Sequence, residues 1–329
     1  MSCGSVLAGM NSRLEAVLAC PRCHGELAAG TESIRCRGCA AEFSLAGGIP
    51  RLNDGAVDRD PRIAAEWEAQ HHAHALYTDR QSIANQWEEQ VLPRLVEWLS
   101  GTDGPILDLG CGVGHFGRTW AARGRHDLDL VGMDLQVELL EDARHGYVGL
   151  VEGDVHRLPV KDGVFGAVVV ANTLHHVSDP GRALLEIQRV LRPGGIVVAY
   201  DPRELRVIEA IKKVVRRKNN AFTEYHRAFR PDEYRDMFAG AGLQLERFAS
   251  VDPFGPLFAT GLDMVRAGRL GVATPVARAL ARLDSIIERA DRTRDFGLML
   301  MALARKPPGP ASHRRPSSYS HGDDGAGHS

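Results

Sequence analysis

Buried strands alternate with amphipathic helices through the middle of the chain. Apolar runs typical of buried strands lie at 106–110, 128–134, 148–154, 165–172 and 195–201. Apolar residues at helical spacing predict helices near 114–123, 136–145 and 180–191. A further helix is predicted at 231–242. Two late strands, at 243–249 and 296–304, bring the number of predicted strands to seven. The alternation predicts an α/β fold with a doubly wound sheet, because helices that connect parallel strands cover both of its faces.

The same patterns divide the chain into four units. Residues 15–55 are rich in turn residues and poor in apolar ones, and so small a module needs a staple. Residues 56–103 have mixed helical spacings that predict a connector or lid, with Pro93 starting or kinking its last helix. Residues 104–306 hold the α/β core, and residues 307–329 are expected to form a disordered tail.

Composition narrows the class of protein. The 329 residues are 44% hydrophobic and 25% charged, which excludes a disordered or collagen-like chain. Forty basic and 42 acidic side chains give a net charge of −2, so the chain lacks the basic excess of a general nucleic-acid binder. We expect a cytoplasmic protein without a membrane span, because no apolar run reaches roughly 18 residues and no signal-peptide pattern opens the chain.

Two Cys-x-x-Cys pairs stand in the N-terminal module. Cys20 and Cys23 form the first, Cys36 and Cys39 the second, and the twelve residues between them suffice for a hairpin. Four thiolates brought to one point make a closed tetrahedral zinc site. A closed site cannot activate water, so the predicted zinc is structural.

A glycine-rich turn follows the first core strand. Gly110, Gly112 and Gly114 let a ligand approach the backbone closely. Gly112, Gly114 and Gly117 also satisfy G-x-G-x-x-G, so the loop alone is equally compatible with a dinucleotide.

Carboxylates at successive strand ends help to decide whether the loop binds a dinucleotide or another ligand. Asp134 stands twenty residues after Gly114, where it can accept both ribose hydroxyls, a feature that a dehydrogenase would share. Asp154 adds a second carboxylate, suited to an adenine amino group, and the sequence has no Tyr-x-x-x-Lys pair for hydride transfer. The pattern favours a nucleoside without a pyrophosphate.

These residues resemble those of a known family. The runs LDLGCGVGHFGR, VGMD and VEGDVHRLPVKDGVFGAVVVANTLHHVSDPGRALLEIQRVLRPGGIVVAYDP are similar to the class I S-adenosylmethionine-dependent methyltransferases, in the branch that resembles ubiquinone and menaquinone methylases. The resemblance covers about residues 104–202 and implies a Rossmann-like seven-stranded sheet. It also implies a donor site made of Asp108, Gly110, Gly112 and Gly114 for the methionine part, Asp134 and Leu135 for the ribose, Asp154 and Val155 for the adenine, and Asn172 beside the sulfonium.

The N-terminal module resembles a second family. LACPRCHGEL, IRCRGCAAEF and GGIPRL are similar to the Trm112-like zinc ribbon, which is found fused ahead of such methyltransferases. The resemblance implies that Cys20, Cys23, Cys36 and Cys39 hold the zinc.

The acceptor has to be inferred from residues outside the donor pattern. His175 and His176 follow the fourth core strand at the end where doubly wound sheets bind ligands, so either is a candidate catalytic base. An apolar pocket is expected between the connector near Trp67, the two histidines and the insertions at 203–225 and 254–290. This pattern predicts methyl transfer to oxygen or carbon of a small organic molecule.

Two other functions stay open. An rRNA base methyltransferase would use the zinc ribbon to bind RNA, although acidic Glu26, Glu32 and Glu42 offset the ribbon arginines Arg22, Arg35 and Arg37. The second open function is a protein that activates a partner and has no catalytic activity of its own. The intact glycine loop argues against this function. The basic helix at 205–217 fits an acidic substrate, a carrier protein, RNA or a solvated surface, and the oligomeric state is open.

Overall fold

The computed structural model describes residues 10–30, 33–55, 90–124, 128–205, 227–252 and 297–309, with residues 61, 64, 275, 279 and 282–284. Outside them lie the connector aromatics near Trp67, the basic helix beyond Leu205, most of the insertion after Asp252, and the tail beyond Gly309. No helix among the described residues is both long and apolar enough to cross a bilayer.

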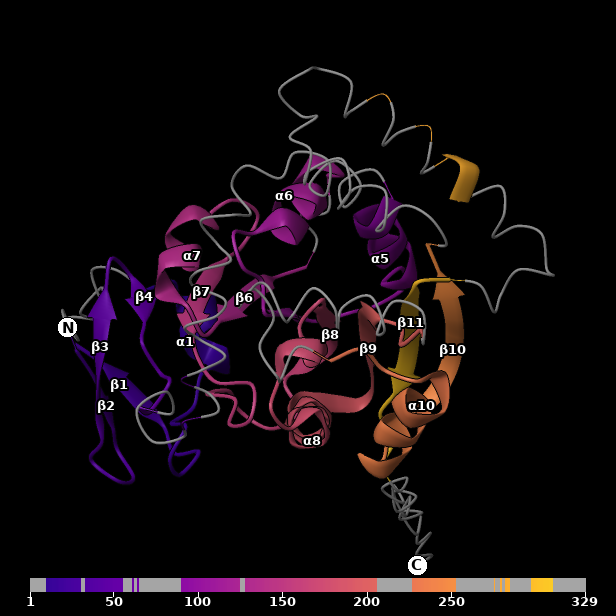
Figure 1. The fold of residues 1–329 in the computed structure, drawn as a ribbon. Coiled ribbons are helices and arrows are strands. Elements are labelled where there is room, and N and C mark those ends of the chain that lie inside the picture. The colour runs from indigo at the N-terminus through magenta and orange to yellow at the C-terminus, as the bar shows by residue number, and fades with distance from the viewer. Residues whose placement is uncertain are drawn as a thin grey trace, which may run out of the picture.

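A seven-stranded sheet forms the centre of the molecule (Figure 1). Its strands are β5 (Ile106–Leu109), β6 (Leu130–Asp134), β7 (Gly149–Glu152), β8 (Phe165–Ala171), β9 (Leu191–Pro202), β10 (Gln244–Val251) and β11 (Met299–Arg305). They lie in the order β10-β11-β9-β8-β5-β6-β7, and β11 is antiparallel to both of its neighbours in an otherwise parallel arrangement. The strand order reverses between β5 and β8, so the connections that follow these two strands lead in opposite directions. In doubly wound sheets, ligands bind at this point, outside the carboxyl ends of the strands. The predicted fold class is confirmed.

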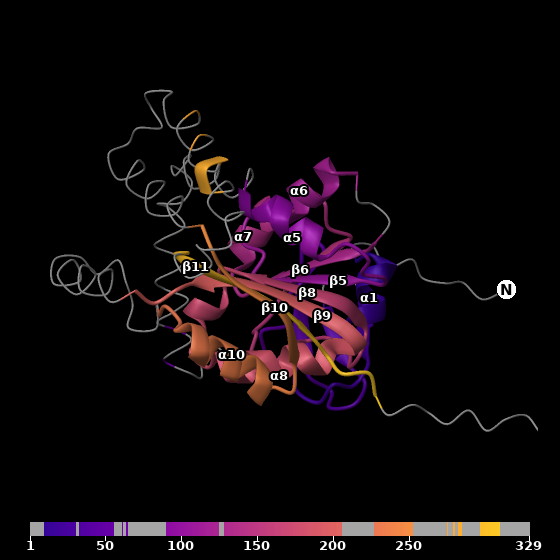
Figure 2. The same ribbon diagram turned by 90° about the vertical axis from the view of Figure 1, so that its right-hand side faces the viewer.

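Helices cover both faces of this sheet (Figure 2). One face carries α5 (Leu92–Trp98), α6 (His115–Ala122) and α7 (Val137–Asp142), and the other carries α8 (Pro180–Val190) and α10 (Pro231–Gly240). Successive strand residues point to opposite faces. Leu107 and Leu109 accordingly pack in the cluster of α8 and α10, whereas Ile106 packs in that of α5 and α6. Burial on both faces explains why strands such as β5, β6 and β8 are nearly continuous apolar runs.

Local sequence sets most helix boundaries where the pattern predicted them. Asp179 caps α8 by accepting a hydrogen bond from the backbone N–H of Arg182 at 2.9 Å. α7 ends at Asp142, three residues before its predicted end, because the chain turns at Gly146, whose φ is +89°, to enter β7.

The N-terminal module is a short helix followed by a small antiparallel sheet. Its elements are α1 (Ser12–Val17), β1 (Leu27–Ala29), β2 (Ser33–Cys36), β3 (Glu42–Ala46) and β4 (Ile49–Pro50). The strands lie in the order β1-β2-β3-β4. The hairpin of β1 and β2 returns the second cysteine pair to the first, as the spacing predicted.

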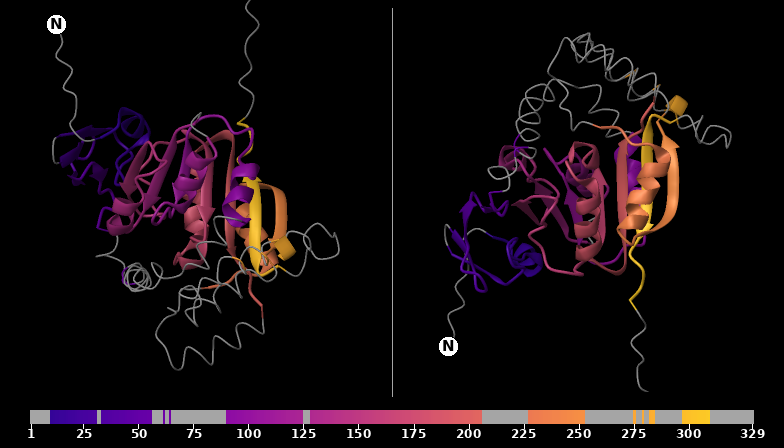
Figure 3. Two further views of the ribbon diagram at one scale, coloured as in Figure 1. Left: turned by 90° about the horizontal axis from the view of Figure 1, so that it is seen from above. Right: turned by 60° about the horizontal axis from the view of Figure 1, so that its bottom comes forward.

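This module packs on the β7 edge of the large sheet (Figure 3). The backbone N–H of Leu52 donates to the carbonyl of Glu152 at 2.8 Å, and the N–H of Ala19 donates to Pro159 at 2.9 Å. Module side chains such as Leu14 belong to the same hydrophobic cluster as Val151 of β7. Along the sequence this module is a unit of its own, whereas in the structure its apolar side chains pack against the core, because so short a module buries too little apolar surface by itself.

Candidate active site and metal centre

The glycine loop connects β5 to α6 at the carboxyl edge of the sheet. Gly110, Gly112 and Gly114 all have positive φ angles, of +75°, +51° and +81°. A Cβ on Gly110 would lie 2.2 Å from Thr173 Oγ1, and one on Gly114 would lie 2.9 Å from Ala143 Cα. A Cβ on Gly112 would meet nothing within 4 Å. The middle of the loop is therefore open to an approaching ligand, while its two ends are packed.

Two buried carboxylates flank this opening. Asp134 accepts hydrogen bonds from the backbone N–H groups of Gly112 at 2.9 Å and Gln136 at 3.0 Å, so it fixes the open part of the loop. Asp108 accepts one from the hydroxyl of Tyr147 at 2.5 Å. Burial raises the pKa of both carboxyls, that of Asp108 to about 7. Buried acceptors of this kind suit a ligand that brings hydrogen-bond donors or a positive charge.

The other predicted donor-site residues lie along the same edge. Asp154 is buried two residues after β7 and accepts from the backbone N–H and the ring Nδ1 of His156, at 2.9 and 2.8 Å. Val155 and Leu135 are partly buried. Asn172, directly after β8, has a φ of +53°, and its N–H donates to Tyr200 at 2.6 Å. A left-handed asparagine at a strand end is a strained conformation of the kind that binding sites hold.

A second polar group surrounds His175. This residue lies in the 3₁₀ helix η2 (Leu174–His176), and its backbone N–H and ring Nδ1 are 3.1 and 2.9 Å from Asp201 Oδ1. Tyr234 of α10 donates to Asp201 Oδ2 at 2.7 Å. Asp201 is fully buried, and this burial raises its pKa to about 8, while the Tyr234 hydrogen bond lowers it. A histidine oriented by a buried carboxylate is an arrangement suited to proton transfer.

The neighbouring His176 has a different environment. Its ring centroid lies 3.9 Å from that of His175. Burial, together with the neighbouring His175, holds the pKa of His176 well below its usual range, so this imidazole is neutral. Asp201 therefore distinguishes the two candidate bases, because it hydrogen bonds to His175.

Sequence reasoning missed three residues at this edge. Asp201 ends an apolar run just as Asp134 does, so the same strand-end signal could have identified it. Glu152, at the end of β7, pairs with Asp134 in the strand register and contacts Asn53 and Arg51 of the module. Tyr147 carried no signal, because its role depends on residues thirty or more positions away.

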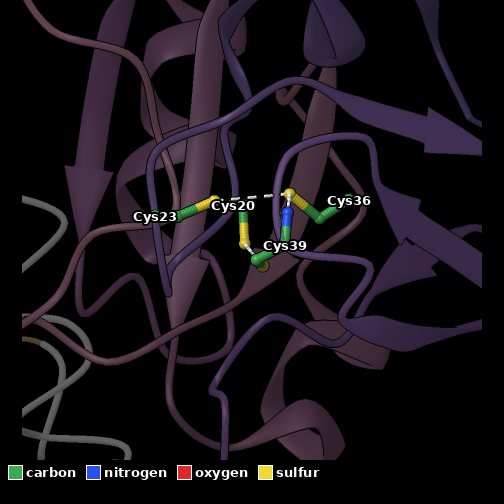
Figure 4. Close-up of side chains that lie close together, drawn as sticks. All are labelled: Cys20, Cys23, Cys36 and Cys39. Atoms are coloured by element: carbon green, nitrogen blue, oxygen red, sulfur yellow. Dashed lines mark hydrogen bonds between the residues drawn. The ribbon is translucent and has the colours of Figure 1, made fainter.

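The four cysteines of the N-terminal module converge (Figure 4). Their sulfur atoms all lie within 4.8 Å of one another, with Cys20 and Cys39 at 3.7 Å and Cys23 and Cys36 at 3.5 Å. Bond lengths of about 2.3 Å in a tetrahedral Zn–S₄ centre imply sulfur separations of about 3.8 Å, whereas a disulfide needs about 2.05 Å. The geometry therefore fits metal ligands and not disulfides.

Backbone donors also favour thiolates in this cluster. The N–H groups of Cys39 and Gly38 donate to the Cys36 sulfur at 3.4 and 3.3 Å, and they lower the pKa of that thiol to about 6. Burial raises the pKa of Cys20 to about 12, so a cation is needed to hold all four groups as thiolates. The remaining described cysteine, Cys111, is a buried free thiol that packs with Ile49 and Leu140, as expected for a small residue in a packed loop.

Comparison with known proteins agrees with this geometry. Residues 107–199 match the family model described as Methyltransferase domain. The matched residues contain the glycine loop, the aspartates Asp108, Asp134 and Asp154, and the His175–His176 turn. The match and the seven-stranded sheet together support a class I methyltransferase core.

Individual relatives match about a hundred residues of the chain. A malonyl-[acyl-carrier protein] O-methyltransferase of Pectobacterium atrosepticum is 36% identical over 94 residues, which are 28% of this chain and 36% of that protein. An uncharacterized transposon protein of Streptomyces fradiae is 42% identical over 101 residues, 29% of either chain. The matched segment thus spans about a third of these curated relatives.

A solved structure shares the fold over a longer stretch. A methyltransferase of Thermotoga maritima, described as a possible histamine N-methyltransferase, aligns with a TM-score of 0.50 and 19% identity over 73% of this chain and 99% of its own. At this identity the likeness concerns the fold alone.

Proposed function

We propose that this chain is an S-adenosylmethionine-dependent methyltransferase that methylates oxygen or carbon of a small organic acceptor. The observation that carries the proposal is the open glycine loop between the buried carboxylates of Asp108 and Asp134. A nucleoside with an amino-acid tail offers hydroxyl donors to one carboxylate and an ammonium group to the other. An intact loop of this form also argues against a non-catalytic, partner-activating protein.

The residues take distinct roles in this proposal. Asp108 and the loop backbone hold the methionine part, Asp134 and Leu135 the ribose, Asp154 and Val155 the adenine, and Asn172 borders the sulfonium. When bound, S-adenosylmethionine supplies a methyl group that is already activated. The chain contributes alignment and exclusion of water, with the acceptor atom held roughly 3 Å from the methyl carbon.

His175 is the proposed base for a hydroxyl acceptor. When Asp201 is ionised, its carboxylate accepts the Nδ1 proton of His175, which leaves the Nε2 lone pair to take a proton from the acceptor as the new bond to the methyl group forms. The Asp201 contact makes His175 the stronger candidate of the two predicted histidines.

The protonation of Asp201 should be visible in the ring of His175. Below pH about 8, Asp201 is protonated, and above it the carboxylate accepts the Nδ1 proton. We therefore expect the population of the Nδ1-protonated tautomer of His175 to increase as the pH rises through 8. Nitrogen NMR of the histidine rings measures this population. Asp201→Asn should abolish this change of tautomer in His175. The same substitution should leave the ring signals of the exposed His145 unaffected. A tautomer that stays constant between pH 6 and 9.5 would contradict the assignment.

Donor binding can be tested by calorimetry. Wild-type protein should bind S-adenosylhomocysteine and bind NAD more weakly. Asp134→Ala should weaken S-adenosylhomocysteine by on the order of 2–3 kcal/mol, about 30- to 150-fold, because it removes charge-assisted hydrogen bonds. The matched control is Asp142→Ala, at the exposed end of α7. Tighter binding of NAD than of S-adenosylhomocysteine would refute the donor assignment.

The rRNA alternative requires an open basic surface on the ribbon. In the structure Arg22 is paired with Asp54, Arg35 with Glu42 and Arg37 with Glu26, while Glu32 lies outside the described residues. These pairings support a small acceptor. The test is transfer of labelled methyl groups to stripped rRNA against transfer to a small-molecule extract. Labelling of the rRNA alone would replace the small-molecule proposal.

We also propose that Cys20, Cys23, Cys36 and Cys39 hold one structural zinc ion. The support is their sulfur spacing and the backbone N–H groups directed at Cys36. Five free thiols among the described residues fit a reducing compartment, which supports a cytoplasmic location.

A further inference from the structure

Tyr147 is held against the first turn of α6 by two glycines. It lies in the connection between α7 and β7, directly after Gly146. A Cβ on Gly117 would lie 2.2 Å from Cε2 of the Tyr147 ring, and a Cβ on Gly146 would lie 2.0 Å from the carbonyl oxygen of Gly117. A side chain on Gly117 would displace the Tyr147 ring, and a side chain on Gly146 would displace the backbone of α6 at Gly117. Gly117, the third glycine of the G-x-G-x-x-G pattern, thus makes room for Tyr147.

The direction of the Tyr147 hydrogen bonds follows from their partners. The backbone N–H of Gly117 can only donate, so the phenolic oxygen, 3.1 Å away, accepts. The hydroxyl proton is then available for Asp108 Oδ2 at 2.5 Å. A donor at that distance stabilises the ionised form of the carboxyl.

The other groups acting on Asp108 oppose ionisation. Asp134, from the neighbouring β6, and Cys111, in the glycine loop, are the other titratable groups of the described residues that interact with it, and neither is a cation. Burial raises the pKa of Asp108 most, Asp134 raises it further, and the Tyr147 hydrogen bond lowers it. The phenol therefore opposes both burial and the nearby carboxylate.

We propose that Tyr147 is a positioning residue that keeps the Asp108 carboxylate ionised and oriented to bind the ammonium group of an amino-acid-bearing nucleoside. The proposal rests on the donor site described under the proposed function. It extends that site by a residue outside the glycine loop and the strand-end aspartates. In this arrangement Tyr147 determines affinity for the amino-acid end of the ligand and leaves the nucleoside end unaffected.

A pair of ligands separates this role from a purely structural one. S-adenosylhomocysteine carries the amino-acid tail, and 5′-methylthioadenosine lacks it. By calorimetry at pH 7, Tyr147→Phe should weaken S-adenosylhomocysteine about tenfold and leave methylthioadenosine within about twofold. The matched control is Tyr200→Phe, which removes a buried phenol bonded to Asp252 instead and should leave the affinity for S-adenosylhomocysteine unchanged.

Two further measurements make the test independent of one variant. In an Asp108→Asn background, Tyr147→Phe should have no additional effect on S-adenosylhomocysteine. In the wild type, affinity for this ligand should fall as the pH drops below about 7, and Tyr147→Phe should shift that midpoint upward.

The outcomes separate this inference from the proposed function. Equal weakening of both ligands, an unchanged S-adenosylhomocysteine affinity, or a wild-type affinity independent of pH would overturn the role of Tyr147 while leaving the donor assignment in place. A wild-type protein that binds neither ligand would overturn both.

Discussion

His175→Ala is expected to lower the rate of methyl transfer by about 10²–10⁴-fold, the usual contribution of a positioned general base. The physical reason is that Asp201 Oδ1 lies 2.9 Å from the His175 ring, which orients the imidazole for proton transfer. Affinity for S-adenosylhomocysteine should remain nearly unchanged, because the predicted donor contacts come from other residues. The measurement is the initial rate at which label passes from methyl-labelled S-adenosylmethionine to acceptors in the small-molecule extract.

Matched histidine variants make this expectation specific. His145→Ala removes an exposed imidazole and should leave the rate unchanged. His176→Ala should reduce the rate less than His175→Ala does, because the Asp201 hydrogen bond belongs to His175. If His175→Ala weakens donor binding and leaves turnover at saturating donor intact, the residue belongs to the donor site and not to proton transfer.

Cys23→Ser is expected to remove zinc and to destabilise the whole chain. Loss of a structural metal ranks among the largest single-residue effects, about 4 kcal/mol or more, which corresponds to a fall in melting temperature of roughly 10 °C. The effect should extend beyond the module, since Cys20 and Cys36 pack in the same hydrophobic cluster as Val151 of the large sheet. Elemental analysis and thermal unfolding measure the two parts of the prediction.

A neighbouring substitution provides the control for the metal site. Arg37→Ala removes an exposed side chain between the two cysteines of the second pair, and its pairing with Glu26 at 4.0 Å is also exposed. It should retain one zinc per chain and the wild-type melting temperature. Purified wild-type protein that contains no zinc while its ribbon strands remain formed would show that the four thiols are not a metal site.

The sequence alone determined the elements and the separate ligand sets. Apolar runs located the inner strands of the large sheet, because a strand buried on both faces must be apolar throughout, whereas the edge strand β10 has the mixed pattern of a half-exposed strand. Cysteine spacing identified the four sulfur atoms that converge, since two tight turns joined by a hairpin leave few other arrangements. Asp134 and Asp154 were predictable because the carboxyl ends of parallel strands meet at one edge of a sheet, whereas Asp108 followed from the family resemblance. These are local or periodic properties, and such properties can be seen along a chain.

Only the tertiary structure decided how these parts act on one another. Asp201 meets His175 across a separation of 26 residues, and Tyr147 reaches Asp108 across 39. No local pattern records such contacts, because they depend on how β9 and the turn before β7 pack against neighbouring elements. The position of the N-terminal module also depends on tertiary packing, because its few apolar side chains complete a core only against β7. The module that appears separate along the sequence therefore shares one hydrophobic cluster with the large sheet.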